Sequence, residues 1–98
     1  MKITKNLNGT ELTVALEGEL DTLTAPELEN ALKEGLSDLT AITFDFAGLD
    51  YISSAGLRVL LMTYRGMHYG GTVKVINANE IVREVFEVTG FTDIIPVE

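Results

Sequence analysis

Two hydrophobic periodicities alternate along this sequence, and their order restricts the folds that the chain can adopt. Hydrophobic residues occupy every second position at 12–16 and again at 42–46, which predicts two strands with one buried face each. At 28–36, 57–64 and 81–86 they recur every three or four positions, which predicts three amphipathic helices. Strands that alternate with helices in this way indicate an α/β fold.

The start of the chain predicts a β-hairpin. Asn8 and Gly9 form a strong two-residue turn signal, because both central positions of such a turn favour positive φ angles. Residues 2–7 should therefore pair antiparallel with residues 11–17, whose hydrophobic side chains would all lie on one face of the sheet.

The complete predicted element order is β-β-α-β-α-β-α-β. Short strands are expected at 73–76 and at 94–95, the latter as an edge strand before Pro96. Strands that are joined through a helix should run parallel. The predicted fold is therefore α/β, with one mixed, mostly parallel sheet, an N-terminal antiparallel hairpin and helices packed on one face. With 98 residues, the chain has the length of a single domain, 1–98.

The first and second helices carry start and stop signals. Thr24 and Glu27 have the spacing of a capping box, in which the two side chains bond free backbone N–H groups of the first turn. Pro26 fits the same turn, because its missing N–H costs nothing there. Gly70 and Gly71 are expected to end the second helix.

Composition argues against several classes of function. Seven basic and 15 acidic residues give a net charge of −8, which disfavours nucleic acid as a partner. The chain has no cysteine and one histidine, so no thiolate or zinc site is expected, and we predict no cofactor. It has neither a long apolar segment nor a signal peptide after Met1, which predicts no membrane insertion and a cytoplasmic location.

Tests for enzyme motifs are mostly negative. The sequence contains no G-x-x-x-x-G-K-[ST], G-x-G-x-x-G or G-x-S-x-G pattern. His68 would lie ~20 Å from Ser54 along one continuous helix, which is too far for a catalytic pair. Asp21, Asp45 and Asp50 could converge at one end of the sheet. A carboxylate enzyme or a nucleotide-binding protein therefore stays open as an alternative.

Two adjacent serines mark the start of the second helix. Ser53 or Ser54 would ordinarily cap the helix by accepting a hydrogen bond from a free N–H, which stabilises a protein by ~1 kcal/mol. Gly56 lies just inside the helix, where glycine costs ~1 kcal/mol relative to alanine. The close approach of a partner or of backbone would explain a glycine at this position.

The same helix carries a second stripe of side chains away from its hydrophobic face. The stripe consists of Arg58, Met62, Arg65 and Tyr69, at positions i, i+4, i+7 and i+11. Arginine and methionine are enriched at protein interfaces. The stripe is therefore either a partner surface or an ordinary helix face of mixed polarity.

Residues 50–61 resemble the signature of the STAS domain of anti-sigma factor antagonists. The stretch 18–21 (GELD), followed by Thr24 and Ala25, resembles the start of the first helix in that family, and residues 85–91 resemble its third helix and exit. The resemblance covers nearly the whole chain in order and spacing, and it implies a STAS-like fold. In the usual pattern D-S-[ST]-G-L, this chain has Ser53 in place of the aspartate and Ala55 in place of the second hydroxyl residue.

The resemblance implies a partner switch controlled by phosphorylation. Ser54 takes the place of the phosphate acceptor, with Ser53 as the second choice, and the kinase would be an anti-sigma factor that is also a serine kinase. A serine phosphatase of the PP2C type would reverse the step, and the chain itself would not be an enzyme. The expected partner-binding residues are Asp21, Ser53, Ser54, Gly56, Arg58, Met62, Arg65 and Tyr69. The alternative is a STAS scaffold subunit of another complex, in lipid transport or sensing, with Ser54 only a helix cap.

Overall fold

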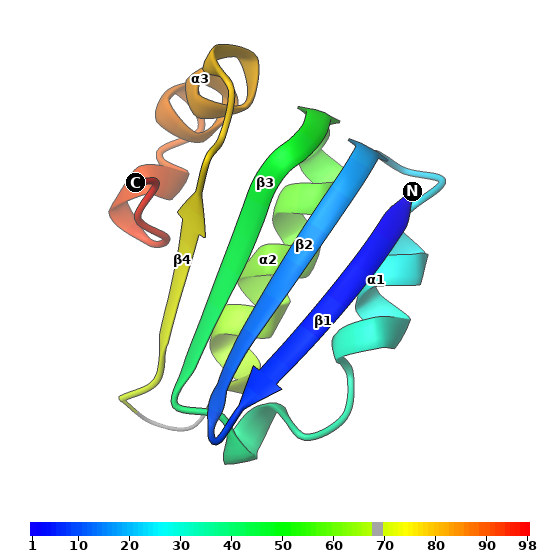
Figure 1. Ribbon diagram of the computed structural model, residues 1–98. Coiled ribbons are helices and arrows are strands. Elements are labelled where there is room, and N and C mark those ends of the chain that lie inside the picture. The colour runs from blue at the N-terminus through cyan, green and yellow to red at the C-terminus, as the bar shows by residue number, and fades with distance from the viewer. Residues whose placement is uncertain (68–69) are drawn as a thin grey trace.

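The computed structural model describes residues 1–67 and 70–98, and it contains a four-stranded sheet (Figure 1). The strands lie in the order β1 (Lys2–Asn8), β2 (Glu11–Leu20), β3 (Ala41–Ile52) and β4 (Thr72–Ile76). β1 pairs antiparallel with β2, whereas β2 with β3 and β3 with β4 pair in parallel. The predicted hairpin and the predicted mixed sheet are confirmed. The turn itself lies one residue later than predicted: Asn8 still pairs with Glu11 in the ladder, so Gly9 (φ +65°) and Thr10 form the turn.

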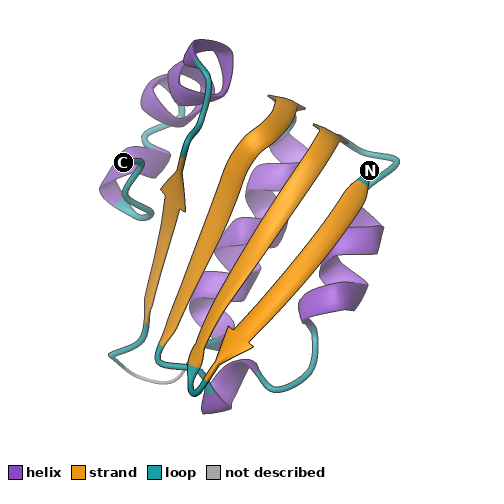
Figure 2. Ribbon diagram, viewed as in Figure 1, coloured by secondary structure: helices purple, strands orange, loops and turns teal. Residues whose placement is uncertain are grey.

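Three helices follow the strands: α1 (Ala25–Leu32), α2 (Ser54–Gly66) and α3 (Glu80–Val88). α1 and α2 lie together behind the sheet, and α3 lies beside the end of β4 (Figure 2). Two single turns of 3₁₀ helix, Leu36–Asp38 and Phe91–Asp93, follow α1 and α3. The α/β fold with its predicted order of helices is therefore confirmed.

The core lies between the helices and one face of the sheet. Val14 of β2, Phe44 of β3 and Val75 of β4 are fully buried on this face. Phe86 of α3 packs against Phe46 of β3 with ring centroids 6.4 Å apart, so α3 joins the same core. Among the described residues, no helix covers the opposite face of the sheet (Figure 1).

β3 is longer than its hydrophobic alternation predicts. It continues to Ile52, well beyond the alternating positions 42–46 that predicted it. Its pairing with β2 shifts register twice, between Ala15 and Glu17 and between Gly18 and Glu19. Such irregularities change which face a side chain occupies. The later part of β3 therefore lacks the regular alternation of hydrophobic residues by which a strand is predicted.

The predicted capping box of α1 is wrong. The Thr24 hydroxyl accepts a hydrogen bond from the Asp21 N–H (2.9 Å) and donates one to the Glu19 carbonyl (2.7 Å). It makes no capping bond to the first turn of the helix. The Asp21 carboxylate instead accepts from the N–H groups of Leu23 (2.9 Å) and Thr24 (3.1 Å). An aspartate turn before the helix thus replaces the reciprocal Thr–Glu cap.

α2 ends earlier than predicted. Its last residue is Gly66 rather than a residue next to Gly70, because Met67 adopts an extended conformation (ψ 156°) and buries its side chain. The Met67 N–H still bonds the Tyr64 carbonyl at 3.3 Å, which closes the final turn. Residues 68 and 69 lie outside the described residues.

The last predicted strand is reduced to a single bridge. Val97 pairs in parallel with Val75, while Ile95 is buried in the core. The Val75 N–H donates to the Pro96 carbonyl (2.9 Å), and the Glu98 N–H donates to the Val75 carbonyl (2.8 Å). Pro96 has no N–H to extend the ladder. The hydrophobic pair at 94–95 therefore reflects burial rather than strand pairing.

Across residues 1–67 and 70–98, no helix has the length and apolar character needed to cross a bilayer.

Candidate functional site

The loop after β2 and the start of α2 lie side by side at one end of the sheet. Leu20 pairs with Ile52 at the carboxyl ends of these parallel strands, and the Ser53 N–H donates to the Leu20 carbonyl at 2.9 Å. Asp21 and Ser53 are therefore the first residues beyond one strand pair. At the carboxyl ends of parallel strands, loops from different strands meet and form binding sites. This is the end of the sheet that faces upward in Figure 1.

The two adjacent serines have different environments. Ser54 is the first residue of α2 and is exposed to solvent. The Ser53 hydroxyl oxygen is buried and has no hydrogen-bond partner among the described residues. Ser53 occupies the N-cap position of α2 with an extended backbone, and its carbonyl accepts a hydrogen bond from the Leu57 N–H at 3.0 Å. Its side chain makes no capping bond to the helix. Of the two, only Ser54 presents a hydroxyl that a modifying enzyme can reach.

The first turn of α2 favours negative charge next to Ser54. The backbone N–H groups at the start of any helix have no partner within the helix, and the helix dipole places partial positive charge there. The first turn of α2 contains no acidic side chain that would take this position. A phosphate attached to Ser54 would therefore lie in a favourable field.

Asp21 shapes the neighbouring loop. Hydrogen bonds from the backbone N–H groups of Thr24 and Leu23 and from the Thr24 hydroxyl stabilise its ionised form. These bonds, led by the one from the Thr24 backbone, outweigh desolvation and lower the pKa of Asp21 below its ordinary value. Asp21 therefore remains a carboxylate that orders the loop beside Ser53.

Gly56 is explained by packing inside the chain. It is buried, and a Cβ at this position would lie 2.7 Å from Leu20 Cγ and 2.9 Å from Ile52 Cγ1. Real Cβ atoms essentially never come this close to another heavy atom. The close approach inferred from the sequence is therefore that of the sheet end, and the assignment of Gly56 to a partner-binding surface is wrong.

A shallow groove runs between α1 and α2 and is lined at one end by Ala55, the residue after Ser54. The exposed side chains of Arg58 and Met62 lie on its α2 side, and Glu29 lies on its α1 side. The groove continues along the helices past Met62 to Leu36. Of the predicted stripe, Arg58, Met62 and Arg65 are exposed on α2. Tyr69, the fourth member, lies outside the described residues.

Three hydrophobic side chains are exposed in the segments that follow β2, end β3 and begin α3. Leu23 is 85% exposed in the loop before α1, and Tyr51 and Ile81 are also exposed. Asn79, the N-cap of α3, donates to the Leu49 carbonyl at 3.2 Å, which holds the start of α3 near the end of β3. Ile81 belongs to the hydrophobic positions that predicted the third helix, but it is 60% exposed and lies outside the core.

Asp21, Asp45 and Asp50, which the sequence left open as possible catalytic carboxylates, are not joined to one another by hydrogen bonds among the described residues. Asp45 accepts from the Asn77 side chain (3.0 Å) and the Ala47 N–H (3.0 Å), whereas Asp21 bonds only within its own loop. Asp50 is exposed. Within the part of the chain that the structure describes, no three His, Cys, Asp or Glu side chains are placed to hold a metal ion.

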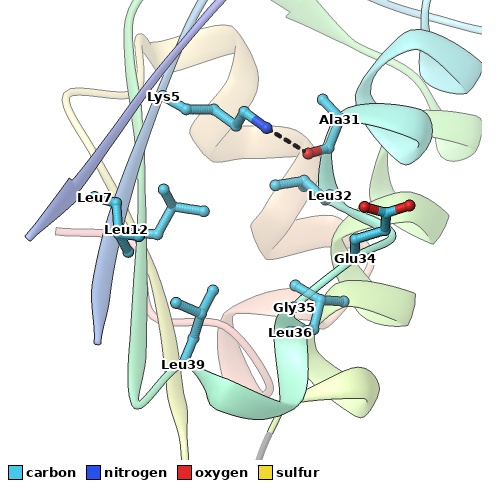
Figure 3. Close-up of a pocket in the computed structure, with 9 residues that line it drawn as sticks. All are labelled: Lys5, Leu7, Leu12, Ala31, Leu32, Glu34, Gly35, Leu36 and Leu39. Carbon is cyan, nitrogen blue, oxygen red and sulfur yellow. Dashed lines mark hydrogen bonds between the residues drawn. The ribbon is translucent and has the colours of Figure 1, made fainter. Parts of the chain in front are cut away.

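A second hollow lies at the opposite end of the sheet, near the hairpin turn (Figure 3). Its walls are mainly apolar, and Lys5 extends across it to donate a hydrogen bond from Nζ to the Ala31 carbonyl at 2.9 Å. The leucines that line it are Leu7, Leu12, Leu32, Leu36 and Leu39. None of the predicted site residues lies in this hollow.

Comparisons with known proteins agree with this geometry. A family model described as "Mlab, STAS domain" matches residues 3–96. BtrV of Bordetella bronchiseptica, named as an anti-sigma factor antagonist, is 35% identical over 99 residues, covering 99% of this chain and 85% of the relative. The anti-sigma-B factor antagonist of Bacillus subtilis is 29% identical over 91 residues, covering 92% of this chain and 84% of the relative.

Solved structures show the same fold. An anti-sigma factor antagonist from Mycobacterium paratuberculosis superposes with a TM-score of 0.88 at 25% identity, covering 98% of this chain and 83% of that one. The phosphorylated form of SpoIIAA, a Bacillus cell fate determinant, gives 0.77 at 19% identity, covering 99% and 91%. The chain belongs to the STAS domain family, and its relatives in that family are named anti-sigma factor antagonists.

Proposed function

We propose that this protein is an anti-sigma factor antagonist whose residues 1–98 act as one domain. In its unmodified form it binds an anti-sigma factor that is also a serine kinase, and this binding releases the sigma factor. The observation that carries the proposal is the exposed hydroxyl of Ser54 at the first position of α2, on the same helix as the exposed side chains of Arg58 and Met62. The names of its relatives support the same role.

Phosphorylation of Ser54 would turn this binding off. The kinase transfers the γ-phosphoryl group of ATP to the Ser54 oxygen, ADP leaves, and the hydroxyl proton passes to a base of the kinase. The product carries about −1.5 to −2 charges at neutral pH. The free N–H groups of α2 accommodate this charge within the domain, so the fold does not change. The cost falls on the complex, in which each ~1.4 kcal/mol weakens binding about tenfold.

In this scheme the chain is a substrate and a binding partner rather than an enzyme. A serine phosphatase of the PP2C type removes the phosphate and restores binding. Because sigma factors act on RNA polymerase, the proposal places the protein in the cytoplasm. The partner surface consists of Ser54, the exposed residues Arg58, Met62 and Arg65 of α2, and the loop that Asp21 orders.

A second candidate function is a scaffold subunit of another assembly, in lipid transport or sensing. The family model that matches this chain carries the description "Mlab, STAS domain", which does not mention anti-sigma factors. In a scaffold, Ser54 would never be modified. Incubation with the cognate anti-sigma kinase and ATP, followed by intact-mass measurement, separates the two: a gain of one phosphate on wild type and none on Ser54→Ala supports the switch.

The direct test of the proposal is the affinity of Ser54→Asp for the anti-sigma factor. We expect a loss of at least about 100-fold in a calorimetric titration, roughly 2.8 kcal/mol. Thermal stability should change little, because aspartate is well tolerated in the first turn of a helix. Ser54→Ala is the matched control and should bind like wild type. Equal affinities for Ser54→Asp and wild type would reject the proposal.

A further inference from the structure

We propose that a phosphate on Ser54 is bound within this chain by Arg58, which is thereby withdrawn from the partner surface. The inference rests on the proposed function in one respect, namely that Ser54 is the phosphate acceptor. It adds a regulatory device: one modification would both place negative charge on the docking surface and remove a positive charge from it.

The positions of the two side chains on α2 carry the inference. Ser54 and Arg58 are both exposed and stand four residues apart. On a helix this spacing places their Cβ atoms about 6 Å apart on one face. Long side chains on a helix lean toward its N-terminus, which directs Arg58 toward Ser54. An acidic group placed four residues before a basic one is also the more favourable order for such a pair.

The guanidinium of Arg58 is available for this role. Among the described residues, no carboxylate lies within 4.0 Å of it, and both ion pairs of the structure involve lysines. The carboxylate that lines the groove together with Arg58 is Glu29 of α1, and Asp21 lies in the loop beside Ser53. Each carries a single charge, whereas a phosphate dianion offers more charge and pairs with the planar guanidinium through two hydrogen bonds.

Binding of the phosphate by Arg58 would change the lining of the groove as well as its charge. Arg58 lines the groove together with Met62 and Pro26 at the end nearest Ser54. A guanidinium that turns toward a phosphate leaves this wall and no longer presents its donors to a partner. The docking surface would therefore lose a hydrogen-bonding side chain without any movement of the backbone.

The test uses the isolated full chain with phosphoserine incorporated genetically at position 54. A ³¹P NMR titration gives the second pKa of the phosphate, which lies near 6 in a free phosphoserine. A bound guanidinium stabilises the dianion, so Arg58→Gln should raise this pKa by about 0.3 unit or more. Arg58→Lys keeps the charge but loses the planar fork and should fall between wild type and Arg58→Gln.

Arg65→Gln is the matched control for the titration. It removes the same charge from the same helix, but its side chain starts about 16 Å from Ser54 along the axis. It should shift the phosphate pKa by less than about 0.1 unit in physiological salt. Equal shifts for Arg58→Gln and Arg65→Gln, or no shift in either, would overturn the inference.

This experiment separates the inference from the proposed function. The titration needs no kinase and no partner, so a failure to bind an anti-sigma factor leaves its outcome unaffected. Conversely, an unchanged phosphate pKa would remove the role of Arg58 but would leave Ser54 as a switch that acts through charge alone.

Discussion

The most direct test of the fold around Ser54 is the substitution Gly56→Ala. Gly56 lies in the first turns of α2, where helix propensity alone favours alanine by about 1 kcal/mol. The structure predicts the opposite result. The added methyl would meet Leu20 Cγ at 2.7 Å, Ile52 Cγ1 at 2.9 Å and Leu20 Cδ2 at 3.0 Å. Leu20 and Ile52 are both buried, so neither can turn toward solvent to make room.

The magnitude follows from two opposing contributions. Extra methyl groups in a well-packed core cost about 1–3 kcal/mol, and three close contacts to two buried side chains place this substitution in the upper part of that range. The gain in helix propensity offsets about 1 kcal/mol. The expected net destabilisation is therefore about 1–2 kcal/mol. For a domain of this size, 1 kcal/mol corresponds to about 4–8 °C in Tm, so Tm should fall by roughly 5–15 °C.

The measurement is a thermal or urea unfolding transition followed by circular dichroism. Gly66→Ala is the matched control, because it lies on the same helix and its added methyl would meet only the Leu36 side chain, with Cδ1 at 3.0 Å and Cβ at 3.8 Å. The closer atom is the end of a flexible and partly exposed side chain. The stability of Gly66→Ala should stay within about 0.5 kcal/mol of wild type. If Gly56→Ala proves as stable as wild type or more so, the inferred packing of α2 against the sheet end is wrong.

Two further substitutions test the groups beside Ser54. Ser53→Ala removes a buried hydroxyl that has no hydrogen-bond partner among the described residues. In urea unfolding it should leave stability unchanged or raise it by up to about 1 kcal/mol, whereas a loss of about 1 kcal/mol would reveal a capping bond. Ser54→Ala, which removes an exposed hydroxyl, is the control. Asp21→Asn should lower Tm at pH 7. Because the pKa of Asp21 is lowered in the folded state, its contribution is present above the ordinary carboxyl pKa and is lost as pH falls through the lower, folded value. The Tm difference between wild type and Asp21→Asn should therefore shrink between pH 5 and pH 3, and a difference that grows on acidification would contradict the role of this carboxylate.

Local patterns in the sequence were sufficient to predict the elements that one strong signal defines. Asn8 and Gly9 predicted the hairpin, and the change from a period of two to helical spacing predicted the order of strands and helices. The position of Ser54 at the start of α2 could also be predicted from the sequence, because it follows from the spacing to Gly56 and Leu57. Each of these features depends on neighbouring residues alone.

The features that the sequence did not predict depend on contacts between distant segments. The Thr24 hydroxyl is engaged by the Asp21 N–H and the Glu19 carbonyl, so the expected capping box does not form. Gly56 looked like a partner contact because nothing in its local sequence shows that Leu20 packs against it. The bridge between Val97 and Val75 depends equally on how the chain turns after α3.

The two outer strands of the sheet differ in how they resist unwanted association. β4 is partly covered by the C-terminal segment through the bridge at Val97, whereas no described strand lies on the outer side of β1. β1 carries Lys2 and Lys5 and no acidic residue. A second copy that added its own β1 here would bring like charges together along the new ladder, which opposes strand-by-strand polymerisation. We therefore expect Lys2 and Lys5 to disfavour the pairing of two copies along the open edge at β1.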